Sequence, residues 1–304
     1  MAAINSAAAI ILSLAHISVK ANLLLLLRMA SHLPLPVLHG VGSLMGLAGL
    51  LNGRYRRRLA GNLAQAGLLC RGAVTSAARE LGKGVVELPL VWLSPLHKTF
   101  AKVRQVRGWD HLEAAHRAGK GVLLLAPHLG CWEICGMYIA SRMPTTALYT
   151  PPRQDWVHAM MREGRERSGA KTVPPDTGGV RALLTKLKGG EAVFILPDQT
   201  ANKGEGQWLR FLDSPAYMPS LPYRLLERTG ATPLIVFAIR LPWGQGYRLH
   251  IEPIPDLHAG DATAQGRQVN QAISALIRQY PEQYLWNYNI YRRRGDMPPV
   301  PEDL

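Results

Sequence analysis

Two short apolar runs, each ended by a proline, constrain the fold of this chain more than any other feature. They are GVLLLA at residues 121–126 and EAVFIL at residues 191–196. Runs of this length and composition predict strands. In open α/β sheets, functional groups collect just beyond the carboxyl ends of the strands. The sequence therefore points to His128, which follows the first run, and to Asp198, which follows the second.

Helical and strand patterns alternate along most of the chain. Residues 232–239 form a third apolar run, and residues 247–251 alternate as a half-exposed strand does. The expected helices include residues 155–168, 180–188 and 265–279. Strands that alternate with helices predict an α/β fold built on a sheet, and no repeat of fixed period suggests a solenoid.

The first apolar segment, residues 7–27, is long enough at ~1.5 Å per residue to cross a hydrocarbon core of about 30 Å. Lys20 lies near its middle, where insertion scales assign a lysine a cost of roughly 2.5–3.5 kcal/mol. A spanning or deeply anchored helix is favoured, and an interfacial helix is the alternative. A cleaved signal peptide is disfavoured, because no basic cluster opens the chain.

A second apolar stretch, residues 33–51, contains two prolines and several glycines, which disfavour a long straight span. An arginine-rich group at residues 54–58 follows it and suits either contact with anionic head groups or an ordinary solvated helix face. We therefore expect residues 1–58 to form a membrane anchor with interfacial helices, and residues 59–304 to form the catalytic domain.

The charge balance restricts the partners. The chain has 35 Lys and Arg against 21 Asp and Glu, a net charge of +14. Anionic lipids, lipid phosphates, nucleic acid and an acidic carrier protein are all favoured by this excess. No basic–aromatic motif for nucleic acid is present, so nucleic acid is not expected. Three unevenly spaced cysteines do not make a disulfide framework, which favours a cytosolic catalytic part.

His128 and Glu133 lie five positions apart around a probable helix start near Gly130. In a continuous helix they would point about 140° apart, so His128 must precede the first regular turn if the two are to meet. A carboxylate on one ring nitrogen would fix the tautomer of a histidine base, and backbone N–H groups near Gly130 would stabilise an oxyanion. Two alternatives stay open: a capping histidine beside a surface glutamate, and a zinc site that includes Cys131 and Cys135.

The segment VRGWDHLEAAHRAGKGVLLLAPHLGCWE, at residues 106–133, resembles the bacterial lipid A late acyltransferase family, which belongs with the lysophospholipid acyltransferases. The resemblance extends from about residue 23 to residue 294. Further blocks follow in family order, and they are the Tyr149 block, MREGRERSGAK at 161–171, EAVFILPDQ at 191–199, FLDSPAYMPSLPYRLLERTGA at 211–231, and PEQYLWNYNIYRRR at 281–294, which resembles a C-terminal helix. The resemblance implies a mixed sheet flanked by helices.

The resemblance also implies roles for individual residues. His128 would be the general base and Glu133 its orienting partner. The family's pattern places Arg165 and Asp198 in the site, with the arginine suited to a phosphate or polar head group. Gly130 and Tyr149 complete the predicted substrate-binding set. Thr150 stands where the family commonly has arginine, which leaves the acceptor lipid open.

The implied reaction is transfer of a fatty acyl chain from acyl carrier protein to a hydroxyl of a lipid A precursor, an anionic glycolipid, at the cytoplasmic face of the inner membrane. The thioester of the carrier protein is the donor, and no cofactor or metal is expected. Acylation of another lysolipid, such as a glycerophospholipid or an amino-acid lipid, is the alternative within enzymes. A basic membrane-binding protein without catalysis is the alternative from another class.

Overall fold

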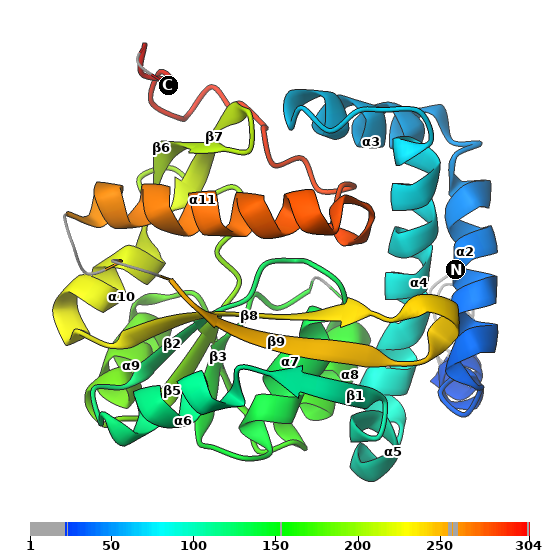
Figure 1. The fold of residues 1–304 in the computed structure, drawn as a ribbon, viewed down its shortest axis with the longest axis horizontal. Coiled ribbons are helices and arrows are strands. Elements are labelled where there is room, and N and C mark those ends of the chain that lie inside the picture. The colour runs from blue at the N-terminus through cyan, green and yellow to red at the C-terminus, as the bar shows by residue number, and fades with distance from the viewer. Residues whose placement is uncertain (1–21, 23, 153, 255–256, 258–260, 303) are drawn as a thin grey trace, which may run out of the picture.

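The computed structural model describes residues 22, 24–152, 154–254, 257, 261–302 and 304. Its centre is a seven-stranded sheet with the strand order β1-β9-β8-β2-β5-β3-β4 (Figure 1). β8 and β9 run antiparallel and the other neighbouring pairs are parallel, so the sheet is mixed, as expected. In sheet order, the strands are β1 (Val103–Arg107), β9 (Tyr247–Pro253), β8 (Thr232–Arg240), β2 (Val122–Leu125), β5 (Ala192–Ile195), β3 (Thr145–Leu148) and β4 (Lys171–Val173).

The two apolar runs form the neighbouring strands β2 and β5, which confirms the prediction for both. Every residue of these two strands is buried. They pair in parallel, with Leu125 opposite Ile195. Because parallel strands end at the same edge of a sheet, the segments that follow β2 and β5 emerge side by side. This register places His128 and Asp198 next to each other.

Helices cover both faces of the sheet and divide its side chains into two apolar clusters. Leu123 and Leu125 belong to one cluster and Val122 and Leu124 to the other, because successive residues of a strand point to opposite faces. The first cluster includes side chains of α9 (Thr177–Lys188), α10 (Leu221–Thr229) and α11 (Ala262–Gln279). The second includes side chains of α6 (Trp109–Arg117) and α7 (Trp132–Ala140).

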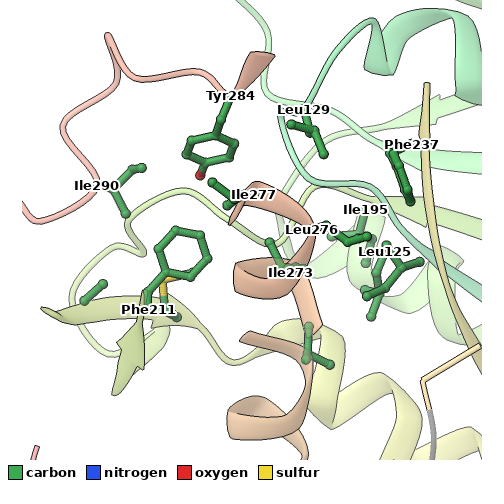
Figure 2. Close-up of a cluster of buried hydrophobic side chains, with 14 of the residues drawn as sticks. Leu125, Leu129, Ile195, Phe211, Phe237, Ile273, Leu276, Ile277, Tyr284 and Ile290 are labelled. Carbon is green, nitrogen blue, oxygen red and sulfur yellow. The ribbon is translucent and has the colours of Figure 1, made fainter. Parts of the chain in front are cut away.

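The longest of these helices, α11, lies across one face of the molecule (Figure 1). Figure 2 shows Ile273 and Leu276 of α11 directed toward Leu125 and Ile195 at the ends of the two central strands. An antiparallel hairpin of β6 (Gly206–Phe211) and β7 (Ser214–Pro219) packs beside α11 and contributes Phe211 to the same cluster. These contacts fix the strand ends that carry the candidate site.

The N-terminal part of the described chain is helical. Residues 24–30 are helical, and α2 (Leu35–Gly49), α3 (Gly53–Gln65), α4 (Ala73–Leu93) and α5 (Leu96–Phe100) follow. α2 and α4 pack closely: a Cβ atom on Gly46 would lie 1.9 Å from the carbonyl oxygen of Ala78. The expected boundary after residue 58 falls inside α3, so a continuous helix joins the two expected parts.

Most of the expected N-terminal anchor, residues 7–27, lies outside the described residues. Within the described part of the chain, no single helix is both long and apolar enough to cross a membrane. The pair formed by α2 and α3 has sufficient length and apolar character together, but the two helices are bent by 98°.

The expected helix at residues 281–294 is wrong. Only Pro281–Gln283 forms a short 3₁₀ turn. The carbonyl groups of Trp286 and Tyr288 accept hydrogen bonds from the Asn62 side chain, each at 2.6 Å, instead of bonding within a helix. Ile290 and Trp286 are buried in the first apolar cluster, and this irregular segment brings both into it.

Candidate active site

His128 lies just beyond the end of β2 and is held by Asp198, which lies just beyond β5. Its ring Nδ1 is 2.8 Å from Asp198 Oδ1, and its backbone N–H donates to Asp198 Oδ2 at 2.8 Å. The Asp198 side chain is fully buried. A buried carboxylate at Nδ1 keeps the proton on that nitrogen, so the lone pair is on Nε2. The structure thus orients His128 as a base.

Gln199 occupies the space in front of that lone pair. Its Nε2 amide group lies 3.0 Å from His128 Nε2. With the imidazole proton on Nδ1, the amide donates and the ring nitrogen accepts. A hydroxyl group that replaced the amide at this position would be at hydrogen-bond distance from the base.

The expected hydrogen bond between Glu133 and the His128 ring is wrong. Glu133 instead accepts two hydrogen bonds from Arg165, at 2.9 Å from Nε and 2.5 Å from Nη2. A third comes from Trp92 Nε1 at 3.0 Å. α7 begins at Trp132, so His128 does precede the first turn, but that turn directs Glu133 to Trp92 of α4 and Arg165 of α8 (Asp155–Glu166), and Asp198 bonds the His128 ring instead.

Glu133 and Arg165 form a buried pair of charges. Burial alone would raise the pKa of Glu133, but the Arg165 guanidinium and the Trp92 hydrogen bond outweigh it and lower the pKa. Burial would lower the pKa of Arg165, and the Glu133 carboxylate reverses that effect. Both side chains are therefore charged at neutral pH. Glu133 holds the guanidinium in a bidentate geometry at the mouth of the site.

Tyr149 supports the arginine. The Arg165 guanidinium carbon lies 5.1 Å from the centre of the Tyr149 ring, within cation–π range. The Tyr149 hydroxyl oxygen is buried and has no hydrogen-bond partner among the described residues. The backbone N–H of Tyr149 donates to the carbonyl oxygen of Val173 in β4. The structure therefore brings Tyr149 and Arg165 together, and binding of substrate by either residue stays a prediction.

Two of the expected oxyanion donors, the N–H groups of Gly130 and Cys131, are already engaged in backbone hydrogen bonds. The Gly130 N–H donates to the Gln283 carbonyl at 3.0 Å, and the Cys131 N–H donates to the Ala238 carbonyl at 2.8 Å. Gly130 has φ +62°, and a Cβ atom there would lie 2.0 Å from the Ala238 oxygen. Glycine is required for this close turn, so Gly130 shapes the site and does not itself donate to substrate.

The cysteines near the site are buried thiols. Burial raises the pKa of Cys131 well above its ordinary value and raises the pKa of Cys135 as well. Both thiols therefore stay protonated at neutral pH, which disfavours either as a nucleophile. In the part of the chain that the structure describes, no group of three or more His, Cys, Asp or Glu side chains is arranged to hold a metal ion.

Trp132 lines two cavities next to the base. Its ring centre lies 5.0 Å from that of His128. One is a narrow cavity of about 30 Å³, lined mostly by apolar side chains and bordered by Glu133 and Arg165. The other is a wider cavity of about 540 Å³, bounded by α2, α4 and residues 283–287. Only the wider of these two has room for an apolar part of a substrate.

Three contacts were missed by reasoning from the sequence. The Asp198 contact with His128 had a signal, since both residues follow neighbouring runs that end in proline. Gln199 had the same signal, because it follows Asp198. The hydrogen bond from Trp92 to Glu133 joins residues 41 positions apart, and no local sequence pattern predicts it.

An oriented histidine, a fixed arginine and an apolar cavity lie together near the carboxyl ends of parallel strands, an arrangement that suits general-base chemistry on an amphiphilic substrate. A family model described as bacterial lipid A biosynthesis acyltransferase matches residues 24–293. The chain therefore belongs to the bacterial lipid A biosynthesis acyltransferase family.

Individual relatives agree with this assignment. A lipid A biosynthesis palmitoleoyltransferase of Escherichia coli is 29% identical over 71% of this chain and 70% of its own length. A lipid A biosynthesis lauroyltransferase of the same organism is 25% identical over 87% of this chain and 88% of its own length. A phosphatidylinositol mannoside acyltransferase of Mycobacterium tuberculosis is 28% identical over 58% of this chain and 55% of its own length.

Proposed function

We propose that this protein transfers a fatty acyl chain from an acyl carrier protein thioester to a hydroxyl group of a lipid A precursor. The observation that carries the proposal is the pairing of His128 with Asp198. It leaves His128 Nε2 directed at the Gln199 amide, in a place where a hydroxyl group can replace that amide. Membership of the family and the names of its relatives support the choice of acyl group and acceptor.

In the proposed reaction, the acceptor hydroxyl displaces the Gln199 amide and gives its proton to His128 Nε2. Its oxygen forms a bond to the thioester carbonyl carbon, and Asp198 stabilises the imidazolium. The tetrahedral oxyanion then collapses, the carbon–sulfur bond breaks, and His128 returns the proton to the leaving thiolate. The products are the ester and the free carrier thiol, with no acyl-enzyme, in line with the protonated thiols of Cys131 and Cys135.

The oxyanion needs donors other than the N–H groups of Gly130 and Cys131. The Arg165 guanidinium uses Nε and one terminal nitrogen for Glu133, which leaves its second terminal nitrogen for substrate. The displaced Gln199 amide is a second donor near the reacting carbon. Fixed donors of this kind stabilise charge that develops in the transition state.

The proposed setting is the cytoplasmic face of the inner membrane, with residues 1–58 in contact with the bilayer. Large apolar side chains are exposed on α2 and just before it, including Met29, Val41 and Leu44. Contiguous exposed apolar surface is typical of interaction sites, and the net charge of +14 favours both anionic lipid and an acidic carrier protein. No cofactor is proposed.

A different lysolipid is the second candidate acceptor, because one relative is a phosphatidylinositol mannoside acyltransferase. The two candidates are separated by giving purified protein a series of acyl carrier protein thioesters with either a tetraacylated lipid A precursor or lysophospholipids. Product in the first case only supports the proposal. Product with lysophospholipids only would replace the proposed acceptor.

Asp198→Asn is expected to lower kcat by about 10²–10⁴-fold while the fold is retained. The amide introduced at this position would be neutral, so it could not balance the charge of an imidazolium. It would also have one acceptor oxygen in place of two, so the proton on Nδ1 and with it the tautomer of the histidine would no longer be fixed. Steady-state kinetics with circular dichroism tests this. Glu205→Gln is a matched control on an exposed acidic residue away from the base. A kcat within threefold of wild type would exclude Asp198 from the base.

Glu133→Gln and Arg165→Ala are each expected to lower kcat by about 10–10²-fold, because the first change leaves the arginine without the carboxylate that positions it and the second removes the arginine charge. The double variant is expected to lose no more than the worse single variant, since both changes remove one unit. Kinetics on the three variants measures this coupling. Losses that multiply would show that Glu133 acts through a group other than Arg165.

A further inference from the structure

The wider cavity beside Trp132 has no role in the mechanism described above. It holds about 540 Å³, within the roughly 300–1,000 Å³ of pockets that bind small ligands. It lies along the packed pair α2 and α4, residues 283–287 form another part of its wall, and Trp132 is part of its lining. Because the Trp132 ring is 5.0 Å from the His128 ring, a ligand in this cavity would reach close to the base. We call this cavity the α2–α4 groove.

The wall of the groove is mostly apolar. Met45, Leu81, Val85 and Leu88 contribute side chains, and glycines of α2 and α4 leave the wall without side chains between them. The polar side chains of the lining include Glu80 and Arg240, which pair with each other: Glu80 Oε2 lies 3.5 Å from Arg240 Nη1. The mainly apolar wall suits a hydrocarbon chain.

The mouth of the groove continues an exposed apolar surface. Met45 is 52% exposed and Val85 is 59% exposed, although both line the groove. Val37, Val41 and Leu44 of α2 extend the surface beyond the mouth. Where such a surface meets a bilayer, a lipid chain enters the groove without crossing water.

The rim of the groove is polar and positively charged at the start of α3. Asn52 and Tyr55 line the groove where α2 gives way to α3. The arginines of this turn and helix are exposed, and they are Arg54, Arg56, Arg57 and Arg58. Guanidinium groups bind phosphate through paired hydrogen bonds. The groove and its rim therefore match an amphiphile with an anionic head group and an apolar chain.

We propose that the α2–α4 groove binds a hydrocarbon chain already attached to the acceptor lipid and so places the acceptor hydroxyl at His128. This rests on the proposed function, since it names how that acceptor is held. The groove suits the acceptor because its exposed mouth admits a lipid that has several chains. The cavity beside Arg165 holds only about 30 Å³, roughly the volume of one water molecule, and has no room for a hydrocarbon chain.

Photocrosslinking tests the proposal without catalysis. A lipid A precursor with a diazirine on one of its chains is irradiated with the full chain in the absence of acyl donor, and labelled peptides are mapped by mass spectrometry. Labels on the α2 and α4 peptides that contain Met45 and Val85 are expected, and excess unlabelled precursor should remove them. Labels confined to Met137 or Phe194, which line the narrow cavity, would overturn the proposal, as would labelling that the competitor does not reduce.

Two tryptophan variants give an independent measurement. Val85→Trp fills the mouth of the groove and is expected to raise KM for the acylated acceptor about tenfold, with kcat and KM for the acyl carrier protein within threefold of wild type. Thr75→Trp is the matched control, since Thr75 is exposed on the same helix, α4, and does not line the groove. Equal effects of the two variants, or a raised KM for the donor alone, would contradict the assignment. If wild type acylates no acceptor, the proposed function fails and the crosslinking result still decides the groove.

Discussion

His128→Ala is expected to lower kcat for acyl transfer by about 10²–10⁴-fold, the range for loss of a positioned general base. The substitution removes the nitrogen that accepts the hydroxyl proton and leaves Asp198 buried without its ring partner. KM for each substrate should change little, since the imidazole acts mainly in the transition state. Initial rates with a radiolabelled thioester measure both quantities.

His116→Ala provides the matched control, because His116 is exposed near the end of α6, which leads into the amino end of β2, whereas the site lies beyond the carboxyl end of that strand. It should keep wild-type kinetics. Thermal unfolding of both variants separates a lost base from a lost fold. A His128→Ala protein that is folded and retains a third or more of wild-type kcat would contradict the assignment of the base. Such a result would favour the alternative that the chain is a basic membrane-binding protein without catalysis.

Arg240→Met is expected to lower the free energy of unfolding by about 3–5 kcal/mol, the cost of leaving one member of a buried ion pair alone. The Arg240 guanidinium donates to Glu87 at 2.6 Å and to the Gly130 carbonyl at 3.0 Å. Glu87 also accepts from His39 and Tyr247, and its side chain is 2% exposed. Without the arginine, a buried carboxylate has no full charge to balance it. Urea unfolding measures the loss.

Two comparisons make this prediction specific. Adding Glu87→Gln to Arg240→Met removes the unbalanced charge and should recover much of the lost stability. Arg278→Met breaks an ion pair with Asp213 in which both side chains are about half exposed, and should cost less than about 1 kcal/mol. An Arg240→Met variant no less stable than Arg278→Met would contradict the expected role of the buried pair.

Acid should weaken the same pair. Burial raises the pKa of Glu87, but Arg240 and His39 outweigh burial and hold it at about 2, below the ordinary value of 4.5. A lowered pKa in the folded state means that the stabilisation is complete above pH 4.5 and is lost as the pH falls toward 2. In the Arg240→Met protein this part of the acid dependence should disappear.

The central strands were predictable because their signal is local. Residues 121–126 and 191–196 are apolar throughout, and each run ends at a proline, so the expected strands match β2 and β5 to within a residue or two. The position of the site then followed from the general rule that functional groups in open α/β sheets lie beyond the carboxyl ends of the strands. By contrast, β1 is a VRQVR sequence with partly exposed residues, and its place at the sheet edge depends on pairing with β9.

The site was only partly predictable, because the way its residues pair depends on contacts between distant parts of the sequence. The sequence identified His128, Glu133, Arg165 and Asp198, and the structure gathers all four, but in pairs that the spacing does not give. Spacing favoured Glu133 as the partner of His128, but the first turn of α7, which begins at Trp132, directs Glu133 to Arg165. The pairing of His128 with Asp198 joins residues 70 positions apart through the register of β2 and β5.

The central claim is that His128 and Asp198 act as one unit that removes the proton from the acceptor hydroxyl. A double-mutant cycle tests it most directly, with kcat for transfer to the lipid A precursor measured for wild type, His128→Ala, Asp198→Asn and the double variant. The account predicts that the double variant is no slower than His128→Ala, because Asp198 works only through the histidine. A double variant in which the two losses multiply would show that Asp198 acts independently of His128 and would contradict the account.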